Sequence, residues 1–140
     1  MQFSLPATVN STAEAANANN YPYIRHMTVG QGTSSKVPLN DLQTIERTWA
    51  VANASTVSGG GGFGYLSSVC WFFGKGIADG LGGKVPIGLL NNNWGGTPVE
   101  HWADPPAFKR CNRTDTDSTL FNAMINPFAV GPMALTGFTW

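Results

Sequence analysis

The chain has 140 residues, of which 42% are apolar and 11% aromatic, and its eight basic residues balance eight acidic ones. This length fits about one ordinary domain, since single domains commonly span roughly 100–200 residues. Zero net charge without a basic cluster argues against nucleic acid and anionic membrane surfaces as partners. The sequence holds no apolar run of the roughly 18 residues that a membrane-spanning helix needs. Its first residues lack the basic flank and apolar core of a secretory leader.

Charged residues make up only 11% of the chain, against roughly 25% in typical soluble domains. Such a surface needs another polar cover, and glycans could provide it at three Asn-x-Ser/Thr sequons, those of Asn10, Asn53 and Asn112. The alternative is that the chain is part of something larger. Cys70 and Cys111 could form one bridge or none, and there is no Cys/His cluster with the spacing of a zinc site.

The first half of the chain is predicted to be rich in loops. Residues 7–20 form a polar loop or a short helix, residues 23–29 a strand, and residues 48–52 a short extended piece. A glycine-rich run follows at 58–64. We interpret it as a flexible connector rather than a phosphate-binding loop, because Lys75 is followed by Gly76 and not by Ser or Thr.

The clearest predicted element is a helix over residues 66–81, which Gly82 and Gly83 would end. Its apolar residues recur at steps of three and four, which predicts one buried face. This face consists of Leu66, Val69, Cys70, Phe73, Ile77 and Leu81. On it, Cys70 is expected to be a small buried hydrophobe, with a bridge to Cys111 as the alternative.

The second half of the chain alternates strands and helices. The continuous apolar run at 85–90 is typical of a strand buried on both faces of a parallel sheet. A helix should begin at Pro98, with Thr97 as N-cap and Glu100 completing a capping box. A further helix spans 118–128, and residues 135–140 resemble a strand. The inward side chains of that helix should be Leu120, Phe121, Met124 and Ile125. This order predicts an α/β fold with a parallel sheet.

The loop at 91–100 is the predicted place of chemistry, because open α/β sheets bind ligands beyond the carboxyl ends of their strands. Gly95 and Gly96 would let backbone N–H groups approach an oxyanion or a phosphate. A tight turn that merely needs small residues is the other interpretation. Trp71, Trp94 and Trp102 could stack on a sugar or could lie in the core.

Neither histidine is favoured as a catalytic base. His26 lies within the first predicted strand and is expected to be a packed or edge residue. His101 follows Glu100 directly, and neighbours along a helix point in different directions, so this pair does not make a base with its orienting acid.

Four segments share an order and spacing with one known family: residues 70–75, residues 85–89, the Trp-Gly-Gly-Thr-Pro-x-Glu-x-Trp run at 94–102, and residues 120–127. They resemble the sialate O-acetylesterases, which are SGNH-type esterases. The resemblance implies an α/β fold with a partial doubly wound parallel sheet of the SGNH-hydrolase (flavodoxin-like) type, lacking the first strand and the C-terminal part. Residues 1–140 would form one partial domain. Within it, residues 1–64 are loop-rich with one or two strands, and residues 65–140 run helix–strand–helix–helix–strand.

The resemblance implies hydrolysis of O-acetyl esters of sialic acids. A serine attacks the acetyl carbonyl, a histidine acts as base and then acid, and N–H groups hold the oxyanion. The resemblance implies no metal or cofactor. It also implies a glycosylated protein that is lysosomal or secreted. In this chain, the resemblance assigns Gly95 or Gly96 as the glycine of the oxyanion loop. It implies that Trp94, Thr97 and Glu100 support this loop.

The nucleophile and the base of the family have no counterpart in this chain. The family's serine lies in a Gly-Gln-Ser-Asn-Met motif at the end of its first strand, and residues 1–5 resemble the continuation of that motif. Residues 137–140 resemble the strand that leads into a Tyr-Gln-Gly-Glu segment, and the later Asp-x-x-His segment is absent. We therefore expect a fragment that is inactive alone and needs the remainder of the esterase domain.

The missing first strand also has a structural consequence. In a flavodoxin-like order that strand lies between two others, so two neighbours should be left with unpaired backbone groups. Two other functions stay open. One is a non-catalytic sugar-binding piece that uses the loop at 94–102, and the other is a nucleotide binder that uses the glycine run.

Overall fold

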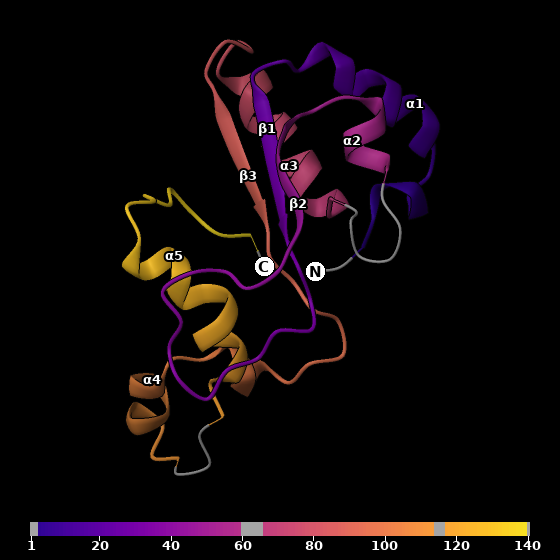
Figure 1. The fold of residues 1–140 in the computed structure, drawn as a ribbon. Coiled ribbons are helices and arrows are strands. Elements are labelled where there is room, and N and C mark those ends of the chain that lie inside the picture. Colours follow the sequence, from indigo (N-terminus) through magenta and orange to yellow (C-terminus); the bar gives the residue numbers. More distant parts are fainter. Residues whose placement is uncertain (1–2, 60–65, 114–116, 140) are drawn as a thin grey trace. The chain divides into compact units, whose positions relative to one another are not determined.

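The computed structural model describes residues 3–59, 66–113 and 117–139, and Figure 1 shows its ribbon. The strands are β1 (Ile24–Val29), β2 (Ile45–Val51) and β3 (Ile87–Asn91). The α-helices are α1 (Ser11–Asn17), α2 (Ala54–Ser58), α3 (Ser68–Gly80), α4 (Pro105–Arg110) and α5 (Asn126–Val130). A π-helical turn, Phe121–Ile125, precedes α5, and single turns of 3-10 helix occupy Leu5–Ala7, Ala18–Asn20 and Val99–Trp102. The predicted α/β class is confirmed.

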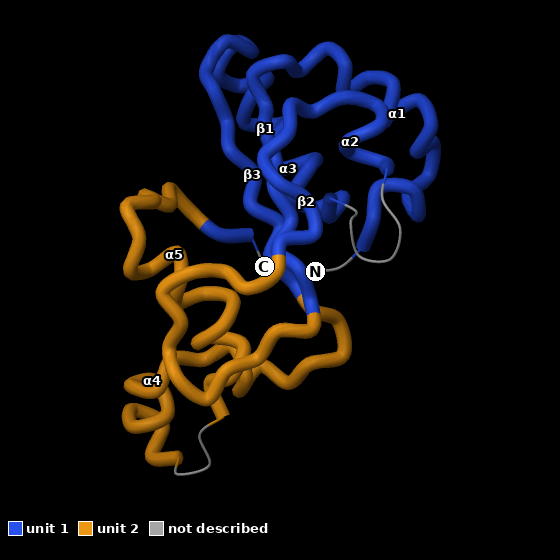
Figure 2. Tube along the Cα trace, viewed as in Figure 1, with its two compact units in different colours: residues 1–31, 45–93, 138–140 blue, residues 32–44, 94–137 orange. Residues whose placement is uncertain are grey.

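The chain folds into two compact units, which Figure 2 distinguishes by colour. Unit 1 comprises residues 1–31, 45–93 and 138–140, and unit 2 comprises residues 32–44 and 94–137. Neither unit is continuous in sequence. Local patterns along the chain predict its elements one by one, and they do not indicate this division.

The sheet belongs to unit 1 and has the order β2-β1-β3. β1 and β3 are parallel, in register from Ile24 opposite Ile87 to Thr28 opposite Asn91. β2 pairs antiparallel with β1, so the sheet is mixed where the sequence predicts parallel strands throughout. The expectation of two strands left with unpaired backbone groups is wrong for β1 and β3, because these two strands hydrogen-bond directly to each other.

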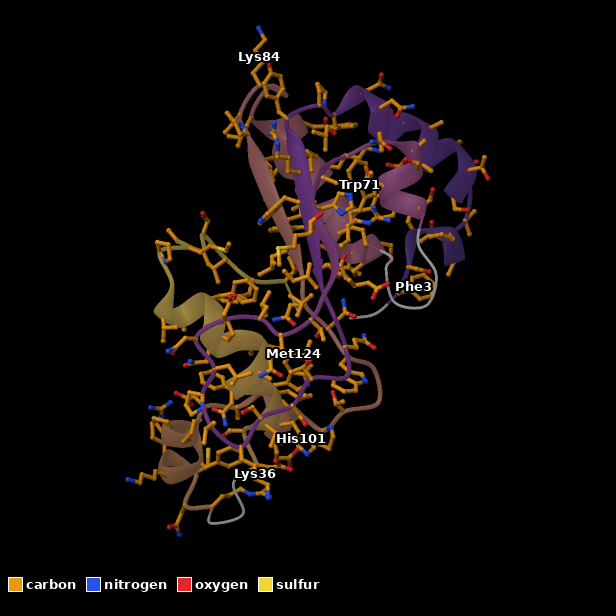
Figure 3. The ribbon with its side chains drawn as sticks, in the orientation of Figure 1. Phe3, Lys36, Trp71, Lys84, His101 and Met124 are labelled. Carbon is orange, nitrogen blue, oxygen red and sulfur yellow. The ribbon has the colours of Figure 1, made fainter. Side chains whose placement is uncertain are left out.

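One hydrophobic cluster joins the helices of unit 1 to its sheet. Its buried members are Leu5, Ala15, Ala18, Ile24, Ala52, Val57, Leu66, Trp71, Ala78 and Leu89. Trp71 on α3, which Figure 3 labels, is the largest fully buried side chain of the cluster. Gly74 lets α3 approach the sheet closely, because a Cβ atom there would lie 2.6 Å from Leu89 Cδ2. Beyond the helix, Gly82 and Gly83 adopt left-handed φ angles of 73° and 71°, which confirms the predicted stop.

α3 buries a different face from the predicted one. Its buried residues are Ser68, Trp71, Gly74 and Ala78. Leu66 is buried as expected, and Val69 and Cys70 are half-buried. By contrast Phe73, Ile77 and Leu81 are 52%, 38% and 52% exposed, so the prediction is wrong for these three. The periodicity shows that α3 carries apolar residues at helical spacing, whereas Gly74 and polar contacts decide which of its faces meets the sheet.

Those polar contacts come from α1 and from the residues after it. Glu14 Oε1 accepts hydrogen bonds from Trp71 Nε1 at 2.9 Å and from Lys75 Nζ at 2.7 Å. Tyr21 donates its hydroxyl to Asp79 Oδ1 at 2.9 Å. Burial raises the pKa of Glu14, but the hydrogen bonds from Lys75 and Trp71, together with the charge of Lys75, outweigh it and lower that pKa. An ionised Glu14 therefore fixes the rotation of α3 against α1.

Unit 2 has no strand among its described residues. The loop before β2 is bonded instead to the helical segment that ends in α5: Ser35 N donates to Thr119 O at 3.0 Å and Leu39 N to Asn122 O at 2.9 Å. Leu120 and Met124 are buried, as predicted, and Phe121 and Ile125 are half-buried. The predicted C-terminal strand is wrong for residues 135–139, which form no ladder with any described strand. Within the described ranges, no helix has both the length and the apolar character of a membrane span.

Candidate functional site

The carboxyl ends of β1 and β3 form a polar edge in unit 1. The two parallel strands end together, since Thr28 lies opposite Asn91. The chain continues into Gly30–Gln31 after β1 and into Asn92–Asn93 after β3. Gln31 Nε2 donates to the main-chain oxygen of Asn93 at 2.8 Å, which ties the two turns together. Open α/β sheets bind their ligands at this kind of edge.

Asn91 links this edge to the start of α3. Its side chain is 4% exposed, and its Oδ1 accepts hydrogen bonds from Asn93 Nδ2 at 2.7 Å and from the Ser67 N–H at 3.3 Å. Ser67 is the residue before the first turn of α3. A buried amide with its oxygen bonded in this way is held rigidly, because losing either bond would leave a buried polar group unpaired.

The first described residues of the chain reach the same place. The main-chain oxygen of Phe3 accepts from the Ser68 N–H at 2.7 Å and from the Ser68 hydroxyl at 2.8 Å. Ser4 and Ser67 form a short antiparallel bridge. Phe3 and Ser4, which belong to the segment that resembles the continuation of the nucleophile motif, thus lie beside the residue that Asn91 binds.

The predicted loop at 91–100 includes Asn91 and Asn93 but assigns neither of them a role, and Gln31 lies outside it. The residues singled out from the sequence lie further along, at Trp94–Glu100. The three amide side chains of this edge end a strand or lie in the turn just after it, and that position was the available signal.

The predicted glycine turn lies in unit 2. The Thr97 hydroxyl donates to the Trp94 main-chain oxygen at 2.6 Å and accepts from Trp102 Nε1 at 2.9 Å. Gly95 and Gly96 are exposed between these contacts. Gly96 has a φ of 79°, and a Cβ atom there would meet nothing within 4 Å. The structure therefore brings Trp94, Thr97 and Trp102 together around an exposed turn.

The predicted capping box is wrong. Val99–Trp102 is a single turn of 3-10 helix that starts after Pro98, without a side-chain cap. The Thr97 hydroxyl is used by Trp94 and Trp102 and so is not available to cap a helix. Glu100 instead lies 3.7 Å from Arg113, measured from Oε1 to Nη1.

His101 has an acidic neighbour other than Glu100. Its Nε2 lies 3.0 Å from Asp117 Oδ2, and both side chains are partly exposed; Figure 3 labels His101. The contact joins the 3-10 turn to the segment before the π-helical turn.

His26 is a packed histidine, as the sequence predicts. It is fully buried on β1, and its two ring nitrogens have no hydrogen-bond partner among the described residues. Burial, helped by the positive charge of Arg47, lowers the pKa of His26 to about 4. The imidazole is therefore neutral at neutral pH. Arg47 Nη2 donates to the Gly59 main-chain oxygen at 3.1 Å, and residues 60–65 of the glycine run lie outside the described ranges.

The three sequons differ in how their asparagines are used. Asn10 and Asn112 are exposed in left-handed turns, with φ angles of 60° and 53°. Asn53 caps α2, with its Oδ1 accepting from the N–H groups of Ser55 and Thr56. Its Nδ2, the atom that a glycan would occupy, donates to the Val51 main-chain oxygen at 3.2 Å.

The two cysteines are both free. Cys70 packs against the core of unit 1, and burial raises its pKa to about 11, so the thiol stays protonated. Cys70 is thus a free thiol packed against the core as predicted, but it is half-buried rather than buried, and Cys111 is exposed. Across the described ranges, no three His, Cys, Asp or Glu side chains are grouped to hold a metal ion.

No protein-family model matches the chain. Sialate O-acetylesterases from Pongo abelii and Homo sapiens are 33% and 32% identical to it over 153 residues, which cover 100% of this chain and 28% of each relative. A sialate O-acetylesterase from Rattus norvegicus is 33% identical over 132 residues, 94% of this chain and 24% of that protein. The chain thus spans about a quarter of the length of these curated relatives.

A solved structure extends the likeness to the fold. A carbohydrate acetylesterase from Xanthomonas citri matches with a TM-score of 0.71 and 29% identity, over 91% of this chain and 27% of that one. The resemblance that the motifs predict is confirmed: the chain is related to the sialate O-acetylesterases and has a partial fold of their SGNH type.

Proposed function

We propose that this chain supplies part of the active site of a carbohydrate esterase that removes acetyl groups from sialic acids or related sugars. The observation that carries the proposal is the exposed glycine turn of unit 2, where the Thr97 hydroxyl is hydrogen-bonded to Trp94 and Trp102 beside Gly95 and Gly96. The names of the relatives and of the structural neighbour support an acetylated carbohydrate as the substrate.

Ester hydrolysis of this kind needs three groups. A serine oxygen forms a bond to the acetyl carbon while a histidine takes the serine proton, and the histidine gives this proton to the sugar oxygen as the ester C–O bond breaks. Water then attacks the acetyl-serine, which releases acetate and restores the serine hydroxyl. The third group consists of the N–H donors that stabilise the negative carbonyl oxygen. This chain supplies that group in our proposal, and we assign the donors to the turn at Gly95 and Gly96. The exposure of Gly96, with open space where a Cβ would lie, allows a substrate oxygen to approach.

Trp94, Thr97 and Glu100 support that turn in this proposal. The hydrogen bonds of Thr97 to Trp94 and Trp102 fix the backbone on both sides of the glycines. No residue of this chain matches the family's serine or its histidine, so residues 1–140 alone should be inactive and need the remainder of the domain. A lysosomal or secreted location is part of the same proposal, and the exposed sequons at Asn10 and Asn112 are its support.

A chimera tests the function. Residues 1–140 replace the matched segment of the Xanthomonas citri acetylesterase, and acetate release is measured from 4-nitrophenyl acetate and from O-acetylated sialic acid. We expect the chimera to hydrolyse both substrates and the isolated chain to hydrolyse neither. Gly96→Ala keeps the main-chain N–H but strains the left-handed turn that directs it, and we expect kcat to fall by about 100-fold, as when an oxyanion donor is displaced.

The matched control is Gly82→Ala. Gly82 also has a left-handed φ, of 73°, with open space around it, but it follows α3. The Gly82→Ala chimera should keep the kcat of the parent chimera. A loss of activity in Gly96→Ala alone then reflects the oxyanion turn and not merely the strain of an alanine with a left-handed φ. A folded chimera without esterase activity, or turnover by residues 1–140 alone, would contradict the proposal.

A sugar-binding role without hydrolysis is the second candidate. It is favoured by the half-buried Trp94 and Trp102, which the Thr97 hydroxyl holds together in an exposed turn. Sialic acid binding by the isolated chain that is abolished by Trp94→Ala would support it over the esterase. The nucleotide-binding alternative rests on the glycine run, most of which lies outside the described residues.

A further inference from the structure

Gln31 and Asn93 mark the two places where the chain leaves unit 1. The chain leaves this unit at residue 31, after β1, and again at residue 93, after β3, and it continues into unit 2 both times. The Gln31 side chain joins these two places, because its Nε2 donates to the Asn93 main-chain oxygen at 2.8 Å. One hydrogen bond across 62 positions of sequence thus holds the start of the segment that leads to Gly95 and Gly96.

Asn93 is held at two points. Its Nδ2 donates to Asn91 Oδ1 at 2.7 Å, and Asn91 is itself 4% exposed at the end of β3. Its main-chain oxygen is held by Gln31. Because a peptide group is planar and trans, a fixed oxygen also fixes the direction of the N–H group of the next residue. The bond from Gln31 therefore sets the orientation of the peptide group that joins Asn93 to Trp94.

The next peptide group along the chain is held as well. The Trp94 main-chain oxygen accepts the Thr97 hydroxyl at 2.6 Å, and the same peptide group carries the N–H of Gly95. Two consecutive peptide groups before the glycines are thus each fixed by one side chain, the first by Gln31 and the second by Thr97. None of the four segments that resemble the known family contains Gln31.

Stability alone does not explain a glutamine at this position. Gln31 Oε1 is buried and has no hydrogen-bond partner among the described residues, and such an acceptor is destabilising. Methionine would fill a similar space without burying an unpaired acceptor. Polar groups that stay unsatisfied in a folded protein often mark a functional site. Here the donor of the same amide is the group that holds Asn93.

We propose that Gln31 is a positioning residue for the glycine turn. Its amide fixes the peptide group after Asn93 and so directs the main-chain N–H groups at Gly95 and Gly96 for the oxyanion. This inference rests on the proposed function, and it adds a residue of unit 1 to the support that Thr97 gives within unit 2. Gln31 itself touches neither the substrate nor the reacting atoms in this proposal.

Fluorine NMR tests the positioning without using esterase activity. Labelling with 5-fluorotryptophan gives one resonance for each of the five tryptophans, and Trp94→Phe and Trp71→Phe assign two of them. In Gln31→Met, which lacks the amide donor, we expect the Trp94 resonance to shift or broaden. The Trp71 resonance, from the buried cluster of unit 1, should stay in place and so report that the variant is folded.

Thr33→Val is the matched control. It removes a hydroxyl two positions after Gln31, which lies 2.9 Å from the Thr44 hydroxyl, and it leaves the bond to Asn93 intact. The Trp94 resonance should be unchanged in this variant. A Trp94 resonance that stays in place in Gln31→Met, or that moves equally in Thr33→Val, overturns the proposal.

The chimera with the Xanthomonas citri acetylesterase gives a second measurement. Gln31→Met should lower kcat by about tenfold and leave KM nearly unchanged, since displacing a catalytic group by about 1 Å can cost about 100-fold. Thr33→Val should keep the parent kcat. Equal kcat in Gln31→Met and in the parent chimera would contradict the positioning role.

Gln31→Glu separates positioning from a general loss of structure. At about pH 8 its carboxylate cannot donate, so its kcat should be as low as that of Gln31→Met. As the pH falls and the carboxyl is protonated, it can donate to the Asn93 oxygen again. The ratio of its kcat to that of the parent chimera at the same pH should therefore rise on acidification. A ratio that stays low at every pH counts against the proposal.

The outcomes separate this inference from the proposed function. A Trp94 resonance that moves in Gln31→Met but not in Thr33→Val, together with a chimera that hydrolyses no ester, keeps Gln31 as the residue that orients the turn and rejects the esterase. A chimera that hydrolyses esters equally well after Gln31→Met keeps the esterase and rejects the role of Gln31.

Discussion

Unit 1 and unit 2 are held together in different ways. Unit 1 has a three-stranded sheet and one cluster of fully buried side chains that spans α1, α2, α3, β1 and β3. Unit 2 has no strand in its described part, and its loop at residues 33–39 is fastened to the helical segment by backbone and amide hydrogen bonds. Unit 2 also buries apolar side chains, among them Leu120, Met124 and Phe128, so the sheet and its connected cluster are what distinguish unit 1.

The difference has an energetic consequence. Truncating a buried apolar side chain removes its transfer free energy and leaves a cavity. Breaking one hydrogen bond costs less, because folding exchanges bonds to water for bonds within the protein. Substitutions in the buried cluster of unit 1 should thus have larger effects than substitutions that break one hydrogen bond in unit 2, and the following experiments test that order.

The largest effect is expected for Trp71→Ala. Trp71 is fully buried, and its indole also donates to Glu14. We expect the free energy of unfolding to fall by about 3–5 kcal/mol, as for other large-to-small core substitutions. Urea unfolding followed by circular dichroism measures it. Phe72→Ala, at the next and exposed position, should change stability by only about 0.5 kcal/mol. Equal losses in the two variants would show that the cluster is not what holds unit 1.

An intermediate effect is expected from acidification, through His26. Its pKa of about 4 in the folded chain lies below the ordinary 6.5, so the unfolded chain takes up a proton first as the pH falls. Stability is then lost between pH 6.5 and 4, by roughly 3 kcal/mol at about 1.4 kcal/mol per pKa unit. His26→Leu should remove this loss and should not destabilise the chain at pH 7, because the buried ring nitrogens have no partner among the described residues.

The measurement is the difference in unfolding free energy between pH 6.5 and 4, compared across variants. Glu14 also contributes to acid lability, since a carboxyl with a lowered pKa loses its stabilising contribution as it is protonated. That part is present in every variant and cancels in the comparison. His101→Leu, in unit 2, should keep the loss that His26 causes. If His26→Leu is as acid-sensitive as the parent chain, burial of this imidazole does not control the pH dependence.

The sequence predicts some features of the fold and not others, and the difference is whether a feature depends on local or distant residues. A β-rich alternating stretch located β1 and a continuous apolar run located β3 within one or two residues, because both patterns are local. The run also predicted burial on both faces, whereas β3 is an edge strand and only partly buried. The rotation of α3 was not predictable from its own residues. It depends on the contact of Gly74 with Leu89 and on Glu14, which lies 61 positions before Lys75. A periodic pattern gives the apolar positions of a helix but not which neighbour covers them.

The candidate site shows the same limit. The exposed turn at Gly95 and Gly96 was predictable, because glycines after a strand mark a backbone that a ligand can approach. The bond between Gln31 and Asn93 spans 62 positions, so nothing local in the sequence indicates it. The capping box failed for a related reason: the Thr97 hydroxyl found partners in Trp94 and Trp102 that the spacing rule does not consider.

The smallest effect is expected in unit 2, for Asn126→Ala. Asn126 Nδ2 donates to the Leu39 main-chain oxygen at 2.9 Å, across 87 positions of sequence. Its loss should cost about 1 kcal/mol and should act locally, because Leu39 N is itself bonded to Asn122 O. Hydrogen exchange should therefore be faster at the Leu39 amide and unchanged at the amides of β1. Asn20→Ala is the control, since Asn20 makes an exposed bond to Asn17 only three positions away. If exchange in β1 accelerates together with that of Leu39, the two units open as one and the distinction between them does not hold.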